Sequence, residues 1–427
     1  MLREAGIGCK RNGEARNHSV ARAGSCLRSL GAAIFAVGFL APATDAFALW
    51  GDRLELFATE SVTHDSNVFR LSNGLDLASL IGSPSAADTY YTTSLGLNLD
   101  VPVSRQRFQA GMTWNDTRYD RFTGLDFLGR DGHATWLWQV GDQWSGQLGY
   151  TERLAPASFL DIHGVTLDPI DRKQTFFNAA YLLTPRWRFQ AGVNSLVQRN
   201  GETLLNAEDV DVDTTEFSAS YITPAKNSVG LDFRVDEGRF PNPELVAGSA
   251  FDNAYAQYTA SVVLDWAVTG KSHLNAQLGR VSRNYYQPPQ RDYDGTTYKA
   301  AYDWRPTGKL SVSLTAHQDI STVTDIQTSF ALVRGKTLGS TLNLTEKTSV
   351  SATLDYSIFD YRGNPALALG LLQHEIDRVR SEILVLTYKP TRSVTFLLNA
   401  QHQTRASTIP FLDFSDNLFG VAGRFAF

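Results

Sequence analysis

Histidine and carboxylate side chains are the first candidates for chemistry in this sequence, because they can serve as acids, bases or metal ligands. Two places bring an imidazole and a carboxylate together along the chain: His64 with Asp65, and Asp161 with His163. Adjacency in a loop is weak evidence for a catalytic pair. The remaining histidines after residue 48 do not pair at metal-ligand spacing on one strand face; they are His133, His273, His317, His374 and His402.

The motifs of common catalytic sites are absent from the sequence. It contains no GxSxG nucleophile elbow, no phosphate-binding glycine loop and no HExxH zinc motif. We therefore expect a protein that is not an enzyme, with no catalytic residues, no metal and no cofactor.

The first 48 residues have the pattern of a secretory signal peptide. Six basic residues lie within 1–29, an apolar run of 11 residues occupies 30–40, and the small residues Ala46 and Ala48 follow in "AFA" at 46–48. Eleven apolar residues are too few to cross a bilayer, which needs about 20. We expect cleavage after Ala48, giving a signal peptide at 1–48 and a mature domain at 49–427.

Removal of residues 1–48 would change the cysteine content and the charge of the protein. Cys9 and Cys26 are its only cysteines, so the mature domain would form no disulfide bond. It would keep 33 of the 39 basic and 41 of the 44 acidic residues, a net charge of −8. Because no basic stripe could displace counterions from phosphates, we expect no nucleic-acid partner. The acidic excess is spread through loops, where we expect solvated surface.

Apolar and polar residues alternate along many segments of the mature domain. Leu310, Val312, Leu314 and Ala316 share one face of a segment whose intervening residues are serine and threonine. The same period of two is found at 95–101, 108–114, 144–150, 229–235 and 298–304. It predicts strands with one apolar and one polar face. The runs last about nine to eleven residues, the length that a tilted strand needs to cross a bilayer.

Short turns alternate with long connections along the chain. Eight short turns are expected near 102–106, 141–143, 184–186, 223–227, 268–271, 305–309, 345–348 and 390–393, and long connections include 65–87, 154–171, 237–252 and 361–375. This asymmetry is typical of outer-membrane barrels, with turns in the periplasm and loops outside. We predict an all-β, transmembrane, antiparallel up-and-down β-barrel of 18 strands that starts near Leu54. Sixteen strands is the alternative, because the segments 53–64 and 333–345 alternate less clearly.

Aromatic residues mark the ends of the expected strands. Those beside the short turns are Phe108, Trp144, Trp187, Tyr221, Trp266, Trp304 and Tyr388. Aromatic rings at strand ends indicate a belt at the membrane interface. Tyr90, Tyr91, Tyr285 and Tyr286 would form an outer belt or, alternatively, stack on sugar rings. The last strand ends in Phe425 and Phe427, as in the C-terminal assembly strand of bacterial outer-membrane proteins.

If the apolar residues face lipid, the residues between them line the lumen. The candidates are Asn98, Asp100, Gln109, Gln147, Arg188, Gln190, Asn194, Asp232, Arg234, Lys299, Asp303, His317, Asp355, Asn399 and Gln401. Amides and charges of both signs suit a neutral or weakly charged hydrophilic solute, although any porin wall would have such a mixture. Sixteen or eighteen strands are enough to leave a channel.

One segment near the start of the mature domain carries a family resemblance. Asp65, Ser66, Asn67, Val68, Phe69 and Arg70 follow the first strand within "LFATESVTHDSNVFRLS" (56–72). This segment resembles the start of the EpsL-type outer-membrane proteins, which are encoded with exosortase-associated extracellular polysaccharide genes. The resemblance implies a role in exopolysaccharide export in a Gram-negative bacterium. From the residues themselves we expect a capped turn in which Asp65 and Asn67 bond their own backbone.

Three functions remain open from the sequence. The first is an outer-membrane barrel that passes polysaccharide during export, the second a general porin for small solutes, and the third a non-conducting surface scaffold or adhesion barrel. The expected partners are outer-membrane lipid and lipopolysaccharide, the barrel assembly machinery, and polysaccharide with periplasmic export components.

Overall fold

The structure is a computed structural model that describes residues 53–162, 164–246, 248–286, 291–321, 330–364, 366, 370 and 373–427. All described residues belong to one compact unit, Ala46–Phe427. The predicted signal peptide at 1–48, both cysteines and His163 lie outside the described residues.

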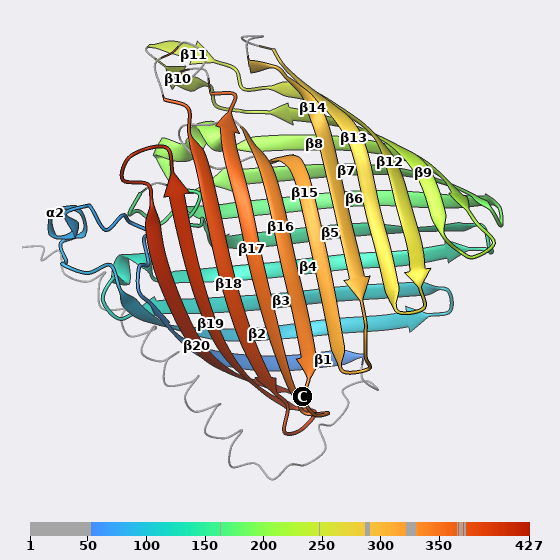
Figure 1. Cartoon of the computed structure of the whole chain (residues 1–427), viewed down its shortest axis with the longest axis horizontal. Coiled ribbons are helices and arrows are strands. Elements are labelled where there is room, and N and C mark those ends of the chain that lie inside the picture. Colours follow the sequence, from blue (N-terminus) through green and yellow to red (C-terminus); the bar gives the residue numbers. More distant parts are fainter. Residues whose placement is uncertain are drawn as a thin grey trace, which may run out of the picture. The chain divides into compact units, whose positions relative to one another are not determined.

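Eighteen antiparallel strands form one closed sheet (Figure 1). Each strand pairs with the next along the chain, and β20 returns to pair with β1, so the sheet closes into a barrel. The barrel strands are β1 (Leu54–Asp65), β2 (Asp88–Val103), β3 (Gln106–Tyr119), β4 (Phe127–Val140), β5 (Trp144–Pro156), β6 (Pro169–Thr184), β7 (Trp187–Asn200), β8 (Val210–Ile222), β9 (Ser228–Arg239), β12 (Tyr255–Thr269), β13 (Ser272–Tyr285), β14 (Tyr293–Trp304), β15 (Leu310–Ser321), β16 (Phe330–Asn343), β17 (Thr348–Arg362), β18 (Ile376–Tyr388), β19 (Val394–Ser407) and β20 (Phe414–Ala426). The structure confirms the predicted 18-strand antiparallel barrel, including both segments that alternate less clearly.

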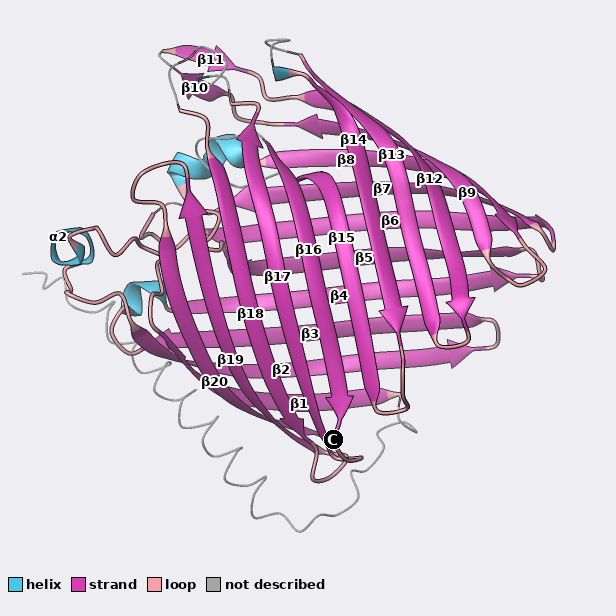
Figure 2. Cartoon of the chain, viewed as in Figure 1, coloured by secondary structure: helices cyan, strands magenta, loops and turns pink. Residues whose placement is uncertain are grey.

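The described elements outside the barrel wall are short and lie in the long connections (Figure 2). A two-stranded hairpin, β10 (Glu244–Val246) and β11 (Ser249–Phe251), follows β9. The helical turns are α2 (Leu77–Ile81), η1 (Thr123–Leu125) and η2 (Thr203–Glu208). Among the described residues, no helix is long and apolar enough to cross a membrane.

The strands are longer than the alternating runs in the sequence indicate. They contain 12 to 16 residues, whereas the apolar alternation covers about nine to eleven, as a membrane crossing requires. The extra residues lie mainly at the long-loop end, where charged side chains continue the same face beyond the apolar ones. In β8, for example, Phe217 is followed toward that end by Thr215, Asp213 and Asp211. Alternation of hydrophobicity therefore marks the membrane band, and the wall extends above it.

Closure of the barrel depends on the pairing of β1 with β20. The ladder runs from Phe57 opposite Ala426 to Asp65 opposite Leu418. Beyond it, Leu56 and Phe427 exchange backbone hydrogen bonds of 2.8 and 2.9 Å. Because lipid offers no water to an open strand edge, this pairing satisfies groups that would otherwise be exposed to hydrocarbon.

The ladder between β14 and β15 is shorter than those on either side of it. Its register covers seven pairs, from Tyr298 opposite Gln318 to Trp304 opposite Val312, while the β13–β14 and β15–β16 ladders cover 12 pairs each. Above the seven pairs, side chains continue the contact. The Thr297 hydroxyl donates to the Gln318 carbonyl (2.9 Å), and the Gln318 amide donates to the Thr296 carbonyl (2.6 Å).

Candidate functional site: the barrel lumen and its long-loop mouth

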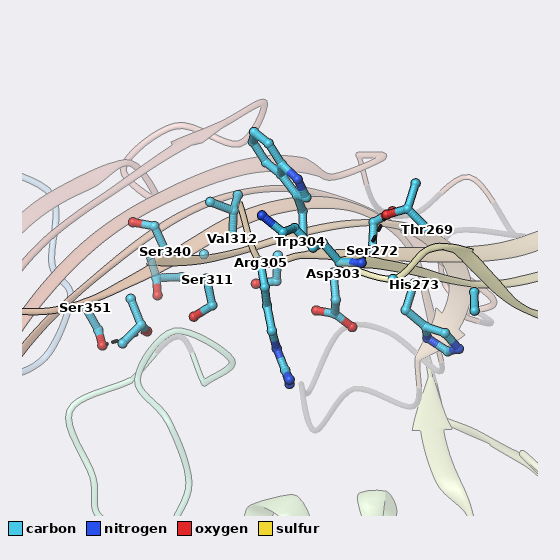
Figure 3. A pocket seen from close by; sticks show the side chains of 17 residues that line it. Thr269, Ser272, His273, Asp303, Trp304, Arg305, Ser311, Val312, Ser340 and Ser351 are labelled. Carbon is cyan, nitrogen blue, oxygen red and sulfur yellow. Dashed lines mark hydrogen bonds between the residues drawn. The ribbon is translucent and has the colours of Figure 1, made fainter. Parts of the chain in front are cut away.

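The two faces of the wall differ in chemistry. Large apolar side chains such as Trp114, Leu231 and Leu398 are exposed on one face, which we call the outer wall. The opposite face is the lumen face. Near the short-turn end, Asp303 and His273 point to the side where other strands of the barrel lie, and Trp304 points away from it (Figure 3). The alternation of each strand thus places apolar residues toward lipid and polar residues toward the interior.

The strand registers place all 15 candidate lumen residues on the lumen face. Asn98 and Asp100 lie opposite Gly111 and Gln109, and this face continues from strand to strand around the barrel. The other candidates that share it are Gln147, Arg188, Gln190, Asn194, Asp232, Arg234, Lys299, Asp303, His317, Asp355, Asn399 and Gln401.

Several of these side chains lie along the wall and bond to neighbours there. Asp100 accepts from the Arg107 guanidinium (2.7 Å), and the Asn98 amide donates to Glu55 (3.1 Å). The Asp355 carboxylate accepts from the hydroxyls of Thr337 (2.7 Å) and Ser357 (2.9 Å). These contacts fix the positions of groups that a solute would meet. His317 and Asn399 lie close over Gly335 and Gly420, where a Cβ atom would come within 2.1 Å of either side chain.

Three recesses in the lumen face gather some of the candidates. A recess of about 330 Å³ joins Gln147, Gln190 and Asn194, and one of about 290 Å³ contains Lys299. The largest, about 760 Å³ near the short turns, contains Asp303 (Figure 3). Further polar residues that were not predicted from the sequence line these recesses: Gln174, Thr214, Glu216, Asp265, His273, Asn275 and Gln277. These residues could have been predicted in the same way, because each alternates along its strand with outward-facing residues, as the predicted lumen residues do.

Opposite charges occupy neighbouring arcs of the lumen face. From β5 to β7 this face carries Arg153, Arg172 and Arg188 and no carboxylate, and Arg153 is directly opposite Arg172 in the register. From β8 to β12 it carries Glu216, Asp232, Asp236 and Asp265 with Arg234 as the only cation. The field across the lumen is therefore asymmetric.

A polar network crosses four adjacent strands near the long-loop end. Asp236 accepts from the Thr214 hydroxyl (2.7 Å) and from the Gln257 amide (3.0 Å), and Gln257 in turn accepts from the Arg283 guanidinium (2.9 Å). Arg283 lies over the Tyr255 ring, with 4.0 Å between the guanidinium carbon and the ring centroid. All of these residues are buried, so the network rigidifies this part of the wall.

A first group of long loops packs around an apolar cluster. Val68 and Phe69 from the β1–β2 loop are buried together with Ala86 and Leu125. The Phe69 ring makes edge contacts with Phe122 (4.8 Å) and Phe159 (5.2 Å) of the next two long loops. Three loops that are distant in sequence thus share one small core at the mouth.

Residues 65–70, which carry the family resemblance, join this cluster to the closure of the barrel. The Asp65 carboxylate accepts from the Asn67 backbone N–H (2.8 Å), and the Asn67 side chain bonds both the N–H (3.0 Å) and the C=O (2.8 Å) of Leu71. Ser66 donates to Asp416 in the last strand (3.0 Å) and accepts from the Asn417 N–H (2.7 Å). Arg70, at a φ of 56°, contacts Asp65 and Asp416 together. The segment is a capped turn that links the first strand to the last.

A second group of long loops is held by a buried polar cluster. Glu244 accepts from the amides of Asn253 (3.0 Å) and Asn364 (3.2 Å), and Arg291 donates to Asn253 (2.7 Å). Burial raises the pKa of the Glu244 carboxyl above its usual range, although the two amides and the Arg291 charge oppose this change. The Glu244 carboxylate therefore connects the loops after β9 and β17, and Arg291 joins the loop after β13 to them through Asn253.

Acidic residues in and next to the long loops do more than solvate the surface, contrary to our expectation for the acidic excess. Asp88 accepts from the backbone N–H groups of Arg121 and Phe122 (3.1 and 2.9 Å), and Asp168 from those of Gly201 and Glu202 (2.8 Å each). Both carboxylates are buried. Each one satisfies the backbone of the neighbouring loop, since buried N–H groups require a partner.

The carboxylate–imidazole pairs from the sequence do not form a catalytic arrangement within the described residues. His64 and Asp65 are consecutive in β1 and so point to opposite faces, with His64 beside the Thr89 hydroxyl (3.0 Å) and Asp65 bound to Arg70. Of the other pair, His163 lies outside the described residues. The structure brings His273 within 2.9 Å of Asp265 on the lumen face, a pair that was not predicted from the sequence. No group of three or more candidate metal ligands occurs among the described residues.

A closed 18-strand barrel with an apolar outer wall and a polar lumen face is a porin-like β-barrel of the bacterial outer membrane. Residues 247–427 match the family model described as "Putative beta-barrel porin 2". No curated protein matches the sequence.

Several solved structures are similar to this chain. OccK2 (OpdF) of Pseudomonas aeruginosa has 10% sequence identity and a TM-score of 0.49, covering 88% of this chain and 98% of its own. OpdK of the same organism, solved with vanillate, has 9% identity and a TM-score of 0.48 over 88% of this chain and 99% of its own. The alcaligin outer-membrane receptor FauA of Bordetella pertussis has 11% identity and a TM-score of 0.42 over 87% and 76%.

Proposed function

We propose that this barrel is a water-filled channel through which small hydrophilic solutes diffuse across the outer membrane. The observation that carries the proposal is the largely polar lumen face, on which amides, hydroxyls and charges line recesses at several heights. Eighteen strands enclose more space than their own inward side chains fill. A polar interior of that size is hydrated, because water solvates these groups at no cost to the wall.

The charges of the lumen face suggest the class of solute. The basic arc at Arg153, Arg172 and Arg188 and the acidic arc at Glu216, Asp232 and Asp265 lie side by side, so an ion of either sign meets one attractive and one repulsive arc. A neutral or zwitterionic molecule with many hydroxyls or amides can hydrogen-bond to both arcs. We infer that such solutes, of about the size of a mono- or disaccharide, pass most readily.

Passage of polysaccharide during export is the second candidate. It rests on the resemblance of residues 65–70 to EpsL-type proteins, and these residues also serve the closure of the barrel through Ser66 and Arg70. The polar lumen face suits a carbohydrate polymer as well as its monomers, so the two candidates differ in the length of the molecule that passes. Deletion of the gene separates them. Loss of extracellular polysaccharide from otherwise healthy cells supports export, and unchanged polysaccharide contradicts it.

Single-channel recording tests the channel itself. The protein, purified from outer membranes, would be inserted into a planar bilayer and titrated with saccharides of increasing length. We expect stable conductance steps that short saccharides reduce reversibly. A folded barrel that never conducts would contradict the channel and favour the scaffold function.

Two neighbouring residues of β7 provide a matched pair of variants. Asn194 lies on the lumen face in a recess, while Val193 is exposed on the outer wall. Asn194→Trp adds a large ring to the lumen, and Val193→Trp adds the same ring to the lipid side. We expect a lower conductance for the first variant and an unchanged one for the second. Equal conductance of both would mean that ions do not pass along this face.

A further inference from the structure

Charged residues form a ring on the outer wall just above the apolar band. In most of the described strands that contribute to this ring, each cation has a carboxylate partner on the outer wall. Arg130 lies 3.1 Å from Glu152, Lys173 lies 3.0 Å from Asp171, and Arg199 lies 2.7 Å from Asp211. Arg239 with Asp213 and Arg280 with Asp294 continue this pattern. Paired charges of this kind present almost no net field to the lipid headgroups.

The ring is different on β16, β17 and β18. There the outer wall carries Arg334 and Lys336 on β16 and Arg378 and Arg380 on β18, all exposed. Asp360 and Arg362 of β17 are on the same face and pair with each other. Among the described residues, one carboxylate on this face, that of Glu382, pairs with one of the four cations, Arg380. Arg334 donates to the neutral Gln318 amide oxygen (2.9 Å). This sector therefore has an excess of about three positive charges.

The register arranges the four cations in a compact array. Lys336 and Arg380 lie on either side of Tyr356 in one row, and Arg334 and Arg378 lie on either side of Ile358 in the next. With strands about 4.8 Å apart and alternate residues about 6.8 Å apart, the array measures roughly 10 by 7 Å. Like charges held so close repel one another, which favours the binding of an anion between them.

An apolar groove begins directly beneath this array. It has a volume of about 700 Å³ and reaches from β14 to β18, with Lys336 and Arg380 at one edge. Ala300 and Ala316 are in the same row as Lys336, and their small side chains leave a hollow there, while Tyr302, Leu314 and Leu338 form the next row toward the short turns. The surface thus combines a group of cations with an apolar hollow that lies beside and below them.

We propose that this outer-wall site binds a phosphorylated glycolipid of the outer leaflet, the lipid A part of lipopolysaccharide. Its phosphates lie between Lys336 and Arg380, and an acyl chain lies over Ala300 and Ala316. The array is on the long-loop side of the apolar band, which is the side of the outer leaflet in an outer-membrane barrel. Charge-assisted contacts of guanidinium and ammonium groups with phosphate supply the affinity.

A second copy of the chain is a poorer occupant for this face. An isologous contact through the array would place four cations against four others. On each side Glu382 is the carboxylate that pairs with the array, while Asp360 is paired with Arg362 and His374. A phosphate-bearing lipid instead neutralises the excess charge and fills the groove. The site lies on the wall, so it does not depend on whether the lumen conducts.

Native mass spectrometry of the full chain, purified from outer membranes into detergent, tests the site with added lipid A. Lys336→Gln with Arg380→Gln removes two cations of the array. Lys173→Gln with Arg199→Gln is the matched control, since it removes one lysine and one arginine that have carboxylate partners on the same outer wall. We expect the apparent Kd for lipid A to rise at least 10-fold in the first variant and less than twofold in the control.

Two further arms identify the chemistry of the ligand. The charge-conserving variant Lys336→Arg with Arg380→Lys should restore binding, which separates loss of charge from loss of fold. Lipid A with one phosphate removed, and phosphatidylglycerol, should bind more weakly than intact lipid A. Equal lipid A binding by the glutamine variant and the wild type would overturn the proposal. So would equal binding of phosphatidylglycerol, or a dimer of the wild type that the glutamine variant fails to form.

Discussion

Arg70 and Asp416 form an ion pair of 3.2 Å between the first long loop and the last strand of the barrel. The Arg70 guanidinium also contacts Asp65, so it lies between two carboxylates, both of them buried. The pair joins parts of the chain about 350 residues apart at the point where the sheet closes. It gives residues 65–70 a role in barrel closure that does not depend on any solute.

Replacement of Arg70 by Met should destabilise the barrel strongly. It leaves Asp65 and Asp416 buried and facing each other without a cation, a change that typically costs about 3 to 5 kcal/mol. Urea unfolding of the protein in detergent micelles, followed by tryptophan fluorescence, measures the effect. Adding Asp416→Asn to Arg70→Met should recover part of the loss.

The matched control for this prediction is an exposed ion pair. Arg105 and Asp142 lie 2.9 Å apart in two short turns, and both side chains are more than half exposed. Arg105→Met should change stability little, because exposed pairs are screened by water. If Arg105→Met and Arg70→Met had the same effect, the buried pair would have no special role in closure.

The loop cluster around Glu244 should become more stable as the pH falls. Burial raises the pKa of this carboxyl in the folded loops above its value in the unfolded chain. The ionised form therefore destabilises the folded loops at neutral pH, and the penalty disappears as the pH decreases through the raised pKa. Hydrogen exchange of the segments near 244–254 and 363–366 at pH 7.5 and pH 5 measures the change.

Glu244→Gln separates the titration of this residue from that of others. The variant keeps the size of the side chain and removes the charge, so its loops should exchange at the same corrected rate at both pH values. Faster exchange of the wild-type loops at pH 5 would contradict the assignment, because it would mean that the ionised carboxylate stabilises the cluster.

The arginine arc of the lumen should control ion selectivity. Arg153→Glu with Arg172→Glu reverses two charges of that arc, so the reversal potential in a salt gradient should shift toward cations. We expect the permeability ratio to change by roughly a factor of 10, the lower end of the range that charged clefts impose on local ion concentration. Arg130→Glu with Lys173→Glu makes the same change of charge on the outer wall and should leave selectivity unaltered.

The last residue should contribute through its backbone as well as its ring. Deletion of Phe427 removes two backbone hydrogen bonds with Leu56, each of which contributes about 1 kcal/mol. Phe427→Ala keeps those bonds, so it should fold in detergent nearly as well as the wild type. A lower amount of this variant in cell outer membranes, with normal folding in detergent, would identify the ring as a signal for the assembly machinery. Equal amounts of both proteins in cells would exclude that role.

The wall of the barrel could be predicted from the sequence because the pattern that defines it, the alternation of apolar and polar residues, lies within each strand. Alternation along segments such as 310–316 gives the face of each residue directly, and short turns such as 141–143 set the strand order. The position of each candidate lumen residue follows from these two facts. The same alternation also places Gln174 and Glu216 on the lumen face, although they were not among the predicted lumen residues.

The mouth could not be predicted because its contacts are distant in sequence. Glu244 and Asn364 are 120 residues apart, and nothing near either residue indicates the other. Asp88 and Asp168 look like ordinary loop acids, and their burial depends on how neighbouring loops fold over them. The full length of the strands could not be predicted for another reason. At the long-loop end of a strand, charged residues replace the apolar ones, so the hydrophobic alternation ends before the strand does.

The short ladder between β14 and β15 makes the wall mechanically uneven. Seven residue pairs join these strands, and the side chains of Thr297 and Gln318 continue the contact in place of backbone bonds. Side-chain bridges tolerate changes of angle that a full ladder resists, so we expect the wall to deform more easily along this line than along the neighbouring ladders. The lipid-facing groove beneath Lys336 starts at the same strands. A lipid bound there would stiffen the wall along this line, and the lipid composition of the membrane would then limit how much the barrel wall deforms.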